Sequence, residues 1–203
     1  MPRLIDHGER RREIARAAWR VIVRDGIGRA SVRAVAKEAR VSAGSLRHVF
    51  TTQRELLVFA LEMVLDRARA RVAALPPRPS TRETVEALAR QFLPLDSERR
   101  TESEVYLALF DAARADVALR AARDAAHGHL RDVCRALIGR LDNGVDLVPG
   151  TDLDLEAARL HALLDGLGAH VVHEPAGADP GWTARVLSRH LDSLATPAVD
   201  ARG

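Results

Sequence analysis

Apolar residues recur every three or four positions along most of this 203-residue chain, and no segment alternates with the two-residue period of a β-strand. The pattern is clear in residues 9–25, where Ile14, Ala18 and Ile22 share one face of a helix. Gly26 follows at the position where a helix stop is expected. The sequence therefore predicts an all-α protein.

Three further helices are predicted within the first 75 residues. Ser31 and Ser42 stand where N-capping hydroxyls are expected, and Thr51 or Thr52 precedes the longest of the three patterns. Three short helices inside about 50 residues form a small bundle, and two of them joined by a tight turn form the helix-turn-helix that lays one helix in the major groove. The predicted helices after the first cover residues 31–39, 43–50 and 53–74.

Proline and glycine breaks divide the rest of the chain into a larger helical body. Pro76, Pro77 and Pro79 interrupt the chain before Ser80, whose spacing to Glu83 is that of a capping box. We therefore expect an N-terminal three-helix bundle followed by a larger all-helical domain. The predicted body helices cover residues 80–94, 101–115, 117–141, 153–173 and 182–194, and the predicted domains cover residues 1–55 for the head, 56–195 for the body and 196–203 for a frayed tail.

The net charge of +3 is divided unevenly along the chain. Residues 1–55 hold 13 Lys or Arg against 6 Asp or Glu, which gives +7, whereas residues 56–203 hold 18 against 22, which gives −4. A small basic segment on a mildly acidic body is typical of a protein whose basic part meets a polyanion such as nucleic acid.

The single cysteine, Cys134, excludes an internal disulfide and a multi-cysteine zinc site, and it agrees with a reducing compartment. No stretch approaches eighteen uninterrupted apolar residues, and residues 1–12 are polar where a signal peptide needs an apolar run. We therefore expect a cytoplasmic protein with no membrane partner.

Residues 31–56 read SVRAVAKEARVSAGSLRHVFTTQREL and resemble the DNA-binding domain of the TetR family of transcriptional regulators. Arg40 stands where the family usually has glycine, so it would adopt a left-handed conformation at a cost of about 1 kcal/mol. The family often has a tyrosine at position 47 and a lysine at position 53; Arg47 can replace the phosphate contact of the tyrosine, and Gln53 does so less strongly. The matching positions are Ser31, Arg33, Ala36, Ala39, Val41, Ser42, Gly44, Leu46, Phe50, Glu55, Leu56 and Leu57.

The third helix is the expected reader of base edges. Leu46, Val49 and Phe50 would hold it against the first two helices, and the opposite side would face the DNA. Hydroxyls and free amides at helix starts suit phosphate oxygens, although these hydroxyls can also cap helices and do nothing else, and the arginines can be ordinary solvated charges. The predicted DNA contacts are Ser31, Arg33, Ser42, Ala43, Gly44, Ser45, Arg47, His48, Thr51, Thr52, Gln53 and Arg54.

In proteins of this family the helical body binds a ligand and forms a dimer. Residues 155–173 and 182–194 are similar to the two terminal helices of the branch typified by the betaine- and choline-responsive repressor. The resemblance implies a homodimer built from these helices, where glycines let the symmetry mate approach closely. The predicted dimer interface is Leu160, Leu164, Gly168, Val171, Val186, Leu187 and Leu191.

A small-molecule effector would bind inside the body, between the long fourth helix and the helices that follow it. The alternative for each of the side chains concerned is a place in an ordinary hydrophobic core. The residues predicted to line the cavity are Phe59, Met63, Phe92, Tyr106, Phe110, His127 and Cys134.

A catalytic or metal site has weaker support in the sequence than DNA binding does. His161 and Asp165 lie four positions apart, and His127 and His129 lie close together, but neither spacing is diagnostic of a metal or acid–base site. No Gly-rich phosphate loop, nucleophile elbow or His-Glu-x-x-His motif occurs. We therefore expect no catalytic residue, no metal and no cofactor.

The leading hypothesis is a homodimeric TetR-like regulator, a repressor that binds a palindromic operator in double-stranded DNA and is released by a small molecule. The alternative is an all-helical ligand-binding or catalytic protein without sequence-specific DNA binding. An activator with the same fold is a third possibility, since activation depends on promoter position.

Overall fold

Nine α-helices and two short 3-10 helices form the described part of the chain, residues 7–142 and 147–195 of the computed structural model. Within those residues there is no β-strand, and the prediction of an all-α protein is confirmed. Residues 1–6, residues 143–146 and the tail predicted at 196–203 lie outside the described residues. The α-helices are α1 (His7–Asp25), α2 (Val32–Glu38), α3 (Ala43–Val49), α4 (Gln53–Ala73), α5 (Thr81–Ala89), α6 (Ser97–Ala112), α7 (Val117–Leu141), α8 (Leu153–His173) and α9 (Gly181–Leu194).

Contacts divide the chain into two compact units. One unit holds the chain up to Arg69 together with Thr101–His127, and the other holds Ala70–Arg100 and the chain from Gly128 onward. The predicted domain boundary between residues 55 and 56 stays a prediction.

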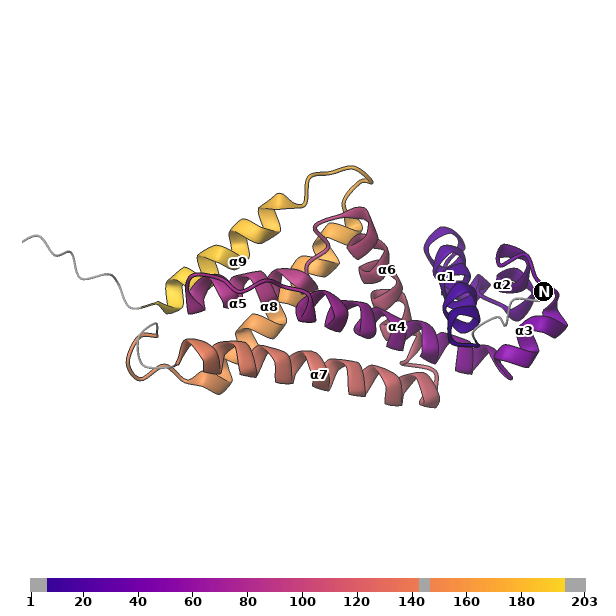
Figure 1. The fold of residues 1–203 in the computed structure, drawn as a ribbon, viewed down its shortest axis with the longest axis horizontal. Helices are drawn as coiled ribbons and strands as arrows, with labels where there is room; N and C mark the ends of the chain where they lie inside the picture. Colours follow the sequence, from indigo (N-terminus) through magenta and orange to yellow (C-terminus); the bar gives the residue numbers. More distant parts are fainter. Residues whose placement is uncertain (1–6, 143–146, 196–203) are drawn as a thin grey trace, which may run out of the picture. The chain divides into compact units, whose positions relative to one another are not determined.

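The first three helices form the small bundle that the sequence predicts. In α1, Ile14, Ala18 and Ile22 are buried as expected. Helices α2 and α3 are only seven residues long, too short to be stable alone in water, so their burial against α1 supports them. Figure 1 shows α1, α2 and α3 grouped beside the first turns of α4.

The turn between α2 and α3 has the left-handed residue that the sequence predicts. Arg40 has a φ of 55°, and it is the one non-glycine residue with positive φ among the described residues. The backbone N–H of Val41 donates to the Ala36 carbonyl at 2.9 Å, which closes the end of α2. The left-handed conformation of Arg40 therefore turns the backbone from the end of α2 toward the start of α3.

Polar contacts join helices α1, α4 and α6 of the first unit. They involve the side chain of Trp19 and an ion pair between Arg67 and Glu102. The Trp19 indole N–H donates to the Ala60 carbonyl of α4 at 3.1 Å. Arg67 of α4 pairs with Glu102 of α6, which is only 3% exposed, and the same guanidinium lies over the Trp19 ring. Pairing stabilises a carboxylate that would otherwise be costly to bury.

The second unit has its own apolar core, built from α5, the later part of α7, α8 and α9. Arg100 donates to the carbonyls of Val171, Val172 and Glu174 at 2.9, 3.1 and 2.7 Å. These carbonyls lie at the end of α8, where intrahelical partners run out, so Arg100 satisfies them. None of the helices in the described residues is long and apolar enough to cross a membrane.

Two predicted helix bounds in the body were wrong by about a turn. Helix α6 begins at Ser97, not at residue 101, because Asp96 caps it and accepts from the Arg99 backbone N–H at 2.8 Å. Helix α5 ends at Ala89, and a short 3-10 turn continues to Phe92.

Candidate nucleic-acid interface

Helix α3 presents one exposed side and one buried side. Leu46 in the helix and Phe50 directly after it are fully buried, and they pack into the core of the first unit. Gly44, Arg47 and His48 are exposed, as predicted for residues that read DNA. Ala43 and Ser45 are half-buried. The side of α3 that is open to a partner is therefore the one that carries an arginine and a histidine.

Gly44 has no packing reason to be glycine. A Cβ built there would meet only the Ser42 hydroxyl oxygen, at an ordinary 3.7 Å. Its space is open on the solvent side, which suits the close approach of another molecule to the helix backbone.

The predicted capping hydroxyls cap their helices. Ser31 Oγ accepts from the backbone N–H of Ala34 at 3.2 Å, and Ser42 Oγ accepts from that of Ser45 at 3.0 Å. Likewise, Thr52 Oγ1 accepts from the Glu55 N–H at 3.0 Å. These three hydroxyls are used within the chain, but each remains exposed, so phosphate contacts by them stay a prediction.

The start of α4 is tied to neighbouring segments. The Gln53 side-chain amide donates to the Ala30 carbonyl at 3.0 Å, so one of its N–H donors is occupied. The backbone N–H of Thr51 donates to Glu55 at 2.9 Å. Arg54 pairs with Asp116 at 2.9 Å. The DNA contacts predicted for Gln53 and Arg54 would therefore compete with the bonds that these side chains make inside the chain.

Sequence reasoning missed Arg11, which fastens the end of α3 to the start of α4. Its guanidinium lies 4.4 and 4.7 Å from the ring centroids of Phe50 and Phe59. It donates to the Val49 carbonyl and to Glu55, each at 3.1 Å. The apolar pattern of α1 gives no signal for this role, because it places Arg11 among several arginines on an outer face.

Many cations of the head are already paired inside the chain. Arg20 and Arg24 both bond to Glu38, at 2.6 and 2.9 Å, and their hydrogen bonds lower the pKa of that carboxyl. These side chains line a groove of about 1050 Å³ between α1 and α2, so much of its charge is neutralised. By contrast, no side-chain hydrogen bond or ion pair to any described residue is made by Arg33, Lys37, Arg40 and Arg47, all of them exposed.

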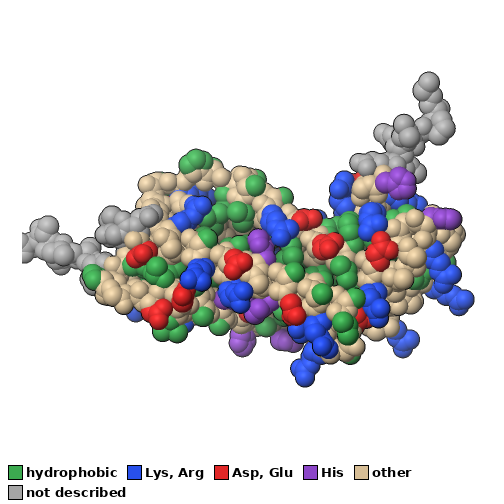
Figure 2. Space-filling model, turned by 90° about the horizontal axis from the view of Figure 1, so that it is seen from below, with side chains coloured by type: hydrophobic (Ala, Val, Ile, Leu, Met, Phe, Trp, Pro, Cys, Tyr) green, Lys and Arg blue, Asp and Glu red, His purple; other side chains and the backbone are tan. Residues whose placement is uncertain are grey.

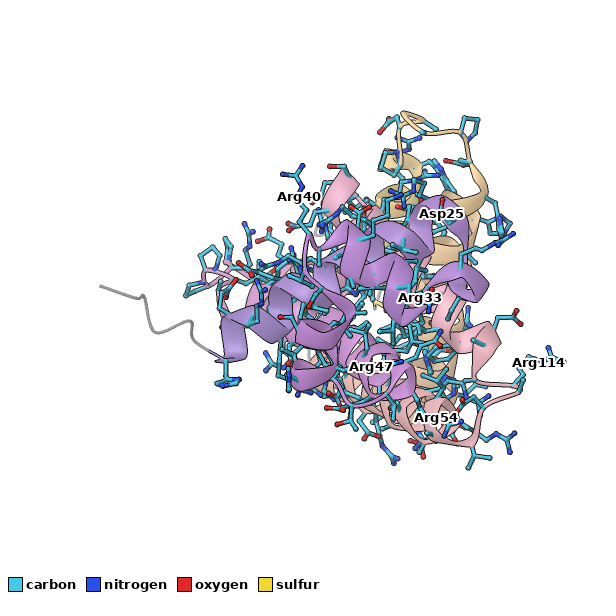
Figure 3. The ribbon with its side chains drawn as sticks, turned by 90° about the vertical axis from the view of Figure 1, so that its right-hand side faces the viewer. Asp25, Arg33, Arg40, Arg47, Arg54 and Arg114 are labelled. Atoms are coloured by element: carbon cyan, nitrogen blue, oxygen red, sulfur yellow. The ribbon has the colours of Figure 1, made fainter. Side chains whose placement is uncertain are left out.

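The exposed cations are spread over the end of the first unit. Figure 3 looks onto this end and shows Arg33 and Arg47 on the helices nearest the viewer, with Arg40 pointing to the side. On the face drawn in Figure 2, blue Lys and Arg side chains project from the right-hand end. The positive charge that the sequence assigns to residues 1–55 is thus displayed on the surface around α2 and α3.

The residues predicted to line a ligand cavity are divided between the two units. Tyr106 and Phe110 lie together on α6, with ring centroids 4.2 Å apart, and His127 lies 6.4 Å from Phe110. Phe59 packs against Phe50, at 5.4 Å, and lies against the same core of the first unit as Tyr106 and Phe110. Met63 belongs to the same core, whereas Phe92 and Cys134 belong to the second unit.

Most residues predicted for the dimer interface are instead part of the chain's own interior. A side chain that a single chain already buries has almost no area left for a partner to cover, so the buried members of this set can contribute little to an interface. Gly168 is half-buried and Val186 is 37% exposed, and both remain open to a partner. At most 2% of the surface is exposed for Leu160, Leu164, Val171, Leu187 and Leu191.

The His161–Asp165 pair considered for chemistry and the thiol of Cys134 both lie in the second unit. His161 Nε2 and Asp165 Oδ2 lie 3.4 Å apart, on side chains one turn apart on α8. Burial raises the pKa of the Cys134 thiol to about 12, with a smaller contribution from Asp165. The thiol is therefore neutral at physiological pH and is not an activated nucleophile.

A three-helix head with an exposed basic helix after a tight turn, in an otherwise all-helical chain, is typical of a helix-turn-helix DNA-binding protein. Residues 14–59 match the family described as bacterial regulatory proteins, tetR family, and residues 79–196 match the BetI-type transcriptional repressor C-terminal family. The chain belongs to the TetR family of transcriptional regulators, and the predicted resemblance to it and to its betaine-repressor branch is confirmed.

Individual relatives extend over nearly the whole chain. The HTH-type transcriptional regulator PksA of Bacillus subtilis (strain 168) is 38% identical over 195 residues, which cover 96% of this chain and 94% of that protein. A transcriptional regulator from Rhodococcus sp. Rha1 has a similar structure, with a TM-score of 0.78, 29% identity and coverage of 91% and 95% of the two chains. A putative transcriptional regulator from Saccharomonospora viridis, solved in complex with choline, has the same fold, with a TM-score of 0.78, 24% identity and coverage of 93% and 99%.

Proposed function

We propose that this regulator is a homodimeric repressor that binds a palindromic operator in the cytoplasm and is released by a small molecule. The observation that carries the DNA-binding part is the exposed side of α3, where Arg47 and His48 have no partner among the described residues. An arginine fork can bond guanine or phosphate, and a histidine can bond either. The capped starts of α2, α3 and α4 lie beside it and would position phosphates.

Two copies are needed to read a palindrome, because half-sites about one helical turn apart are addressed by two recognition helices. Helices α8 and α9 have surface that their own chain leaves open. Leu155 is 57% exposed on α8, Ala162 is exposed about two turns further along, and Val186 is exposed on α9. Small and apolar side chains on two adjacent helices support a four-helix interface with a symmetry mate.

The effector site has less support. Tyr106, Phe110 and His127 lie together in the first unit and combine aromatic surface with polar handles. A relative with the same fold has been solved with choline, which supports a small-molecule ligand of some kind for this chain. A coupling of about 1–3 kcal/mol between ligand and operator would change DNA affinity about 5- to 150-fold.

The DNA-binding proposal is tested by fluorescence anisotropy. The probes are an inverted repeat from the promoter region of the chain's own gene and a scrambled duplex of the same composition. The wild type should prefer the inverted repeat by about 10³-fold or more at physiological salt. Arg47→Ala should weaken binding by about 5- to 150-fold, whereas Arg131→Ala, an exposed arginine on α7, should not. Equal affinity of the wild type for both duplexes would overturn the proposal.

The dimer proposal is tested by sedimentation velocity. Ala162→Arg places a charged, bulky side chain on the exposed side of α8 and should yield monomers. Ala136→Arg, at another exposed alanine on α7, is the control and should remain dimeric. A dimeric Ala162→Arg variant would place the interface elsewhere.

The match to a family of regulators does not favour the alternative of an all-helical protein without sequence-specific DNA binding. We propose no catalytic role.

A further inference from the structure

The turn between α6 and α7, residues 113–116, is fixed to the start of α4. Arg54 Nε donates to Asp116 Oδ2 at 2.9 Å. The other carboxylate oxygen of Asp116 accepts from the backbone N–H groups of Ala118 and Leu119, at 2.9 and 3.2 Å. Asp116 therefore caps α7 and holds Arg54 at the same time. Because the start of α4 is a predicted phosphate-contact segment, the α6–α7 turn lies at the edge of the DNA interface.

Arg114 lies in this turn with a fixed backbone and an unengaged side chain. Its Cα is within about 7 Å of the Asp116 Cα, because only one residue separates them. Its backbone N–H donates to the Asp111 carbonyl at 3.1 Å, and its carbonyl accepts from Arg120 at 3.2 Å. Its exposed guanidinium makes no hydrogen bond or ion pair to any described residue. Backbone hydrogen bonds thus fix the turn, and the Arg114 guanidinium is exposed to solvent.

The turn is open to a partner and carries positive charge. Val117, the residue after Asp116, is 76% exposed, and Arg114 and Ala115 are exposed as well, so this side of the turn is open to solvent. Figure 3 shows Arg114 reaching outward, clear of the ribbon, on the same lower side as Arg47 and Arg54. Asp116 is paired, so the uncompensated charge is mainly cationic. The charged residues here are Arg54, Arg114, Arg120, Asp111 and Asp116.

We propose that Arg114 binds a phosphate of the operator, so that the DNA interface extends beyond the helix-turn-helix to the α6–α7 turn. The inference rests on the proposed DNA-binding function. A phosphate is the fitting partner because each DNA strand presents one every 3.4 Å or so along the helix axis, and arginine bonds phosphate without regard to sequence. The contact adds affinity and salt dependence and leaves base preference unchanged.

The test compares the salt dependence of DNA binding by the full chain. Anisotropy titrations at 50–200 mM NaCl use wild type, Arg114→Gln, Arg114→Lys and Arg131→Gln, each on the inverted-repeat and the scrambled duplex. One lost contact per protomer should reduce the slope of log K against log salt by about 1.8 for a dimer. Over this fourfold range, wild-type affinity should therefore fall about 12-fold more than that of Arg114→Gln. Arg114→Lys should keep the wild-type slope, and so should Arg131→Gln, which removes one exposed charge further along α7.

Equal slopes for wild type and Arg114→Gln would overturn the inference. A change confined to the inverted repeat would overturn it as well, because that result indicates a base contact. A reduced slope on both duplexes supports it. A failure of the proposed function would be seen in a different measurement, because the wild type would then bind the two duplexes with equal affinity. The comparison of salt slopes on the scrambled duplex would still test the contact made by Arg114. Thermal melts of Arg114→Gln should match wild type, since no intramolecular side-chain bond is lost.

Discussion

Replacing Arg11 by methionine should loosen the recognition helix, although Arg11 is not among the predicted DNA contacts. The guanidinium lies over the rings of Phe50 and Phe59 and donates to Val49 and Glu55. Methionine keeps much of the aliphatic length and removes all four interactions. The variant therefore isolates what the charged group contributes to holding the end of α3 against α4.

The magnitude follows from the partial exposure of the site, since the Arg11 side chain is 33% exposed. Each cation–π contact contributes about 0.5–1 kcal/mol in such a setting, and the hydrogen bond to a carbonyl contributes about 1 kcal/mol. The ion pair with Glu55 adds about 0.5 kcal/mol. We expect the free energy of unfolding to fall by roughly 2.5–3.5 kcal/mol, which lowers Tm by about 5–14 °C in a chain of this size.

Thermal unfolding followed by circular dichroism measures this change, at one protein concentration because dimerisation also affects Tm. Arg12→Met is the matched control, because Arg12 makes only an exposed pair with Glu9 and should contribute less than about 1 kcal/mol. Arg11→Met should also weaken operator binding, since α3 loses its fixed position. Equal Tm values for the two variants would refute the reasoning.

Three further predictions concern single side chains. Asp116→Asn should keep the cap of α7 but release Arg54, which could then bind a phosphate of the DNA. The slope of log K against log salt for DNA binding should therefore steepen by about 0.9 per protomer. An unchanged slope would show that Arg54 does not reach the DNA. Because burial raises the pKa of Cys134 to about 12 from an ordinary 9.0, the folded state retains the proton; the stability from this group is complete below pH 9 and is lost as the pH rises from 9 to 12. Titrating unfolding in urea over that range should show a steeper loss for wild type than for Cys134→Ala. Arg40→Gly should raise the free energy of unfolding by about 1 kcal/mol by relieving the positive φ, and an unchanged midpoint in urea would contradict this.

The sequence by itself determined the local features of this protein. Ser31 and Ser42 cap the helices that they precede, and Arg40 takes the left-handed conformation expected where the family has glycine. The exposed and buried sides of α3 also follow from its own pattern of residues. These features depend on hydrogen bonds and steric contacts within about four residues, so the sequence carries them directly.

Only the tertiary structure decided which side chains are available to a partner. Arg11 and Arg54 are engaged by residues 44 and 62 positions away, and no periodicity predicts such pairs. In α8, an apolar pattern identifies Leu160 as part of a face that is removed from water but does not say whether a partner or the same chain covers it. Packing between elements distant in sequence settles both questions, because burial and ion pairing depend on where whole helices meet.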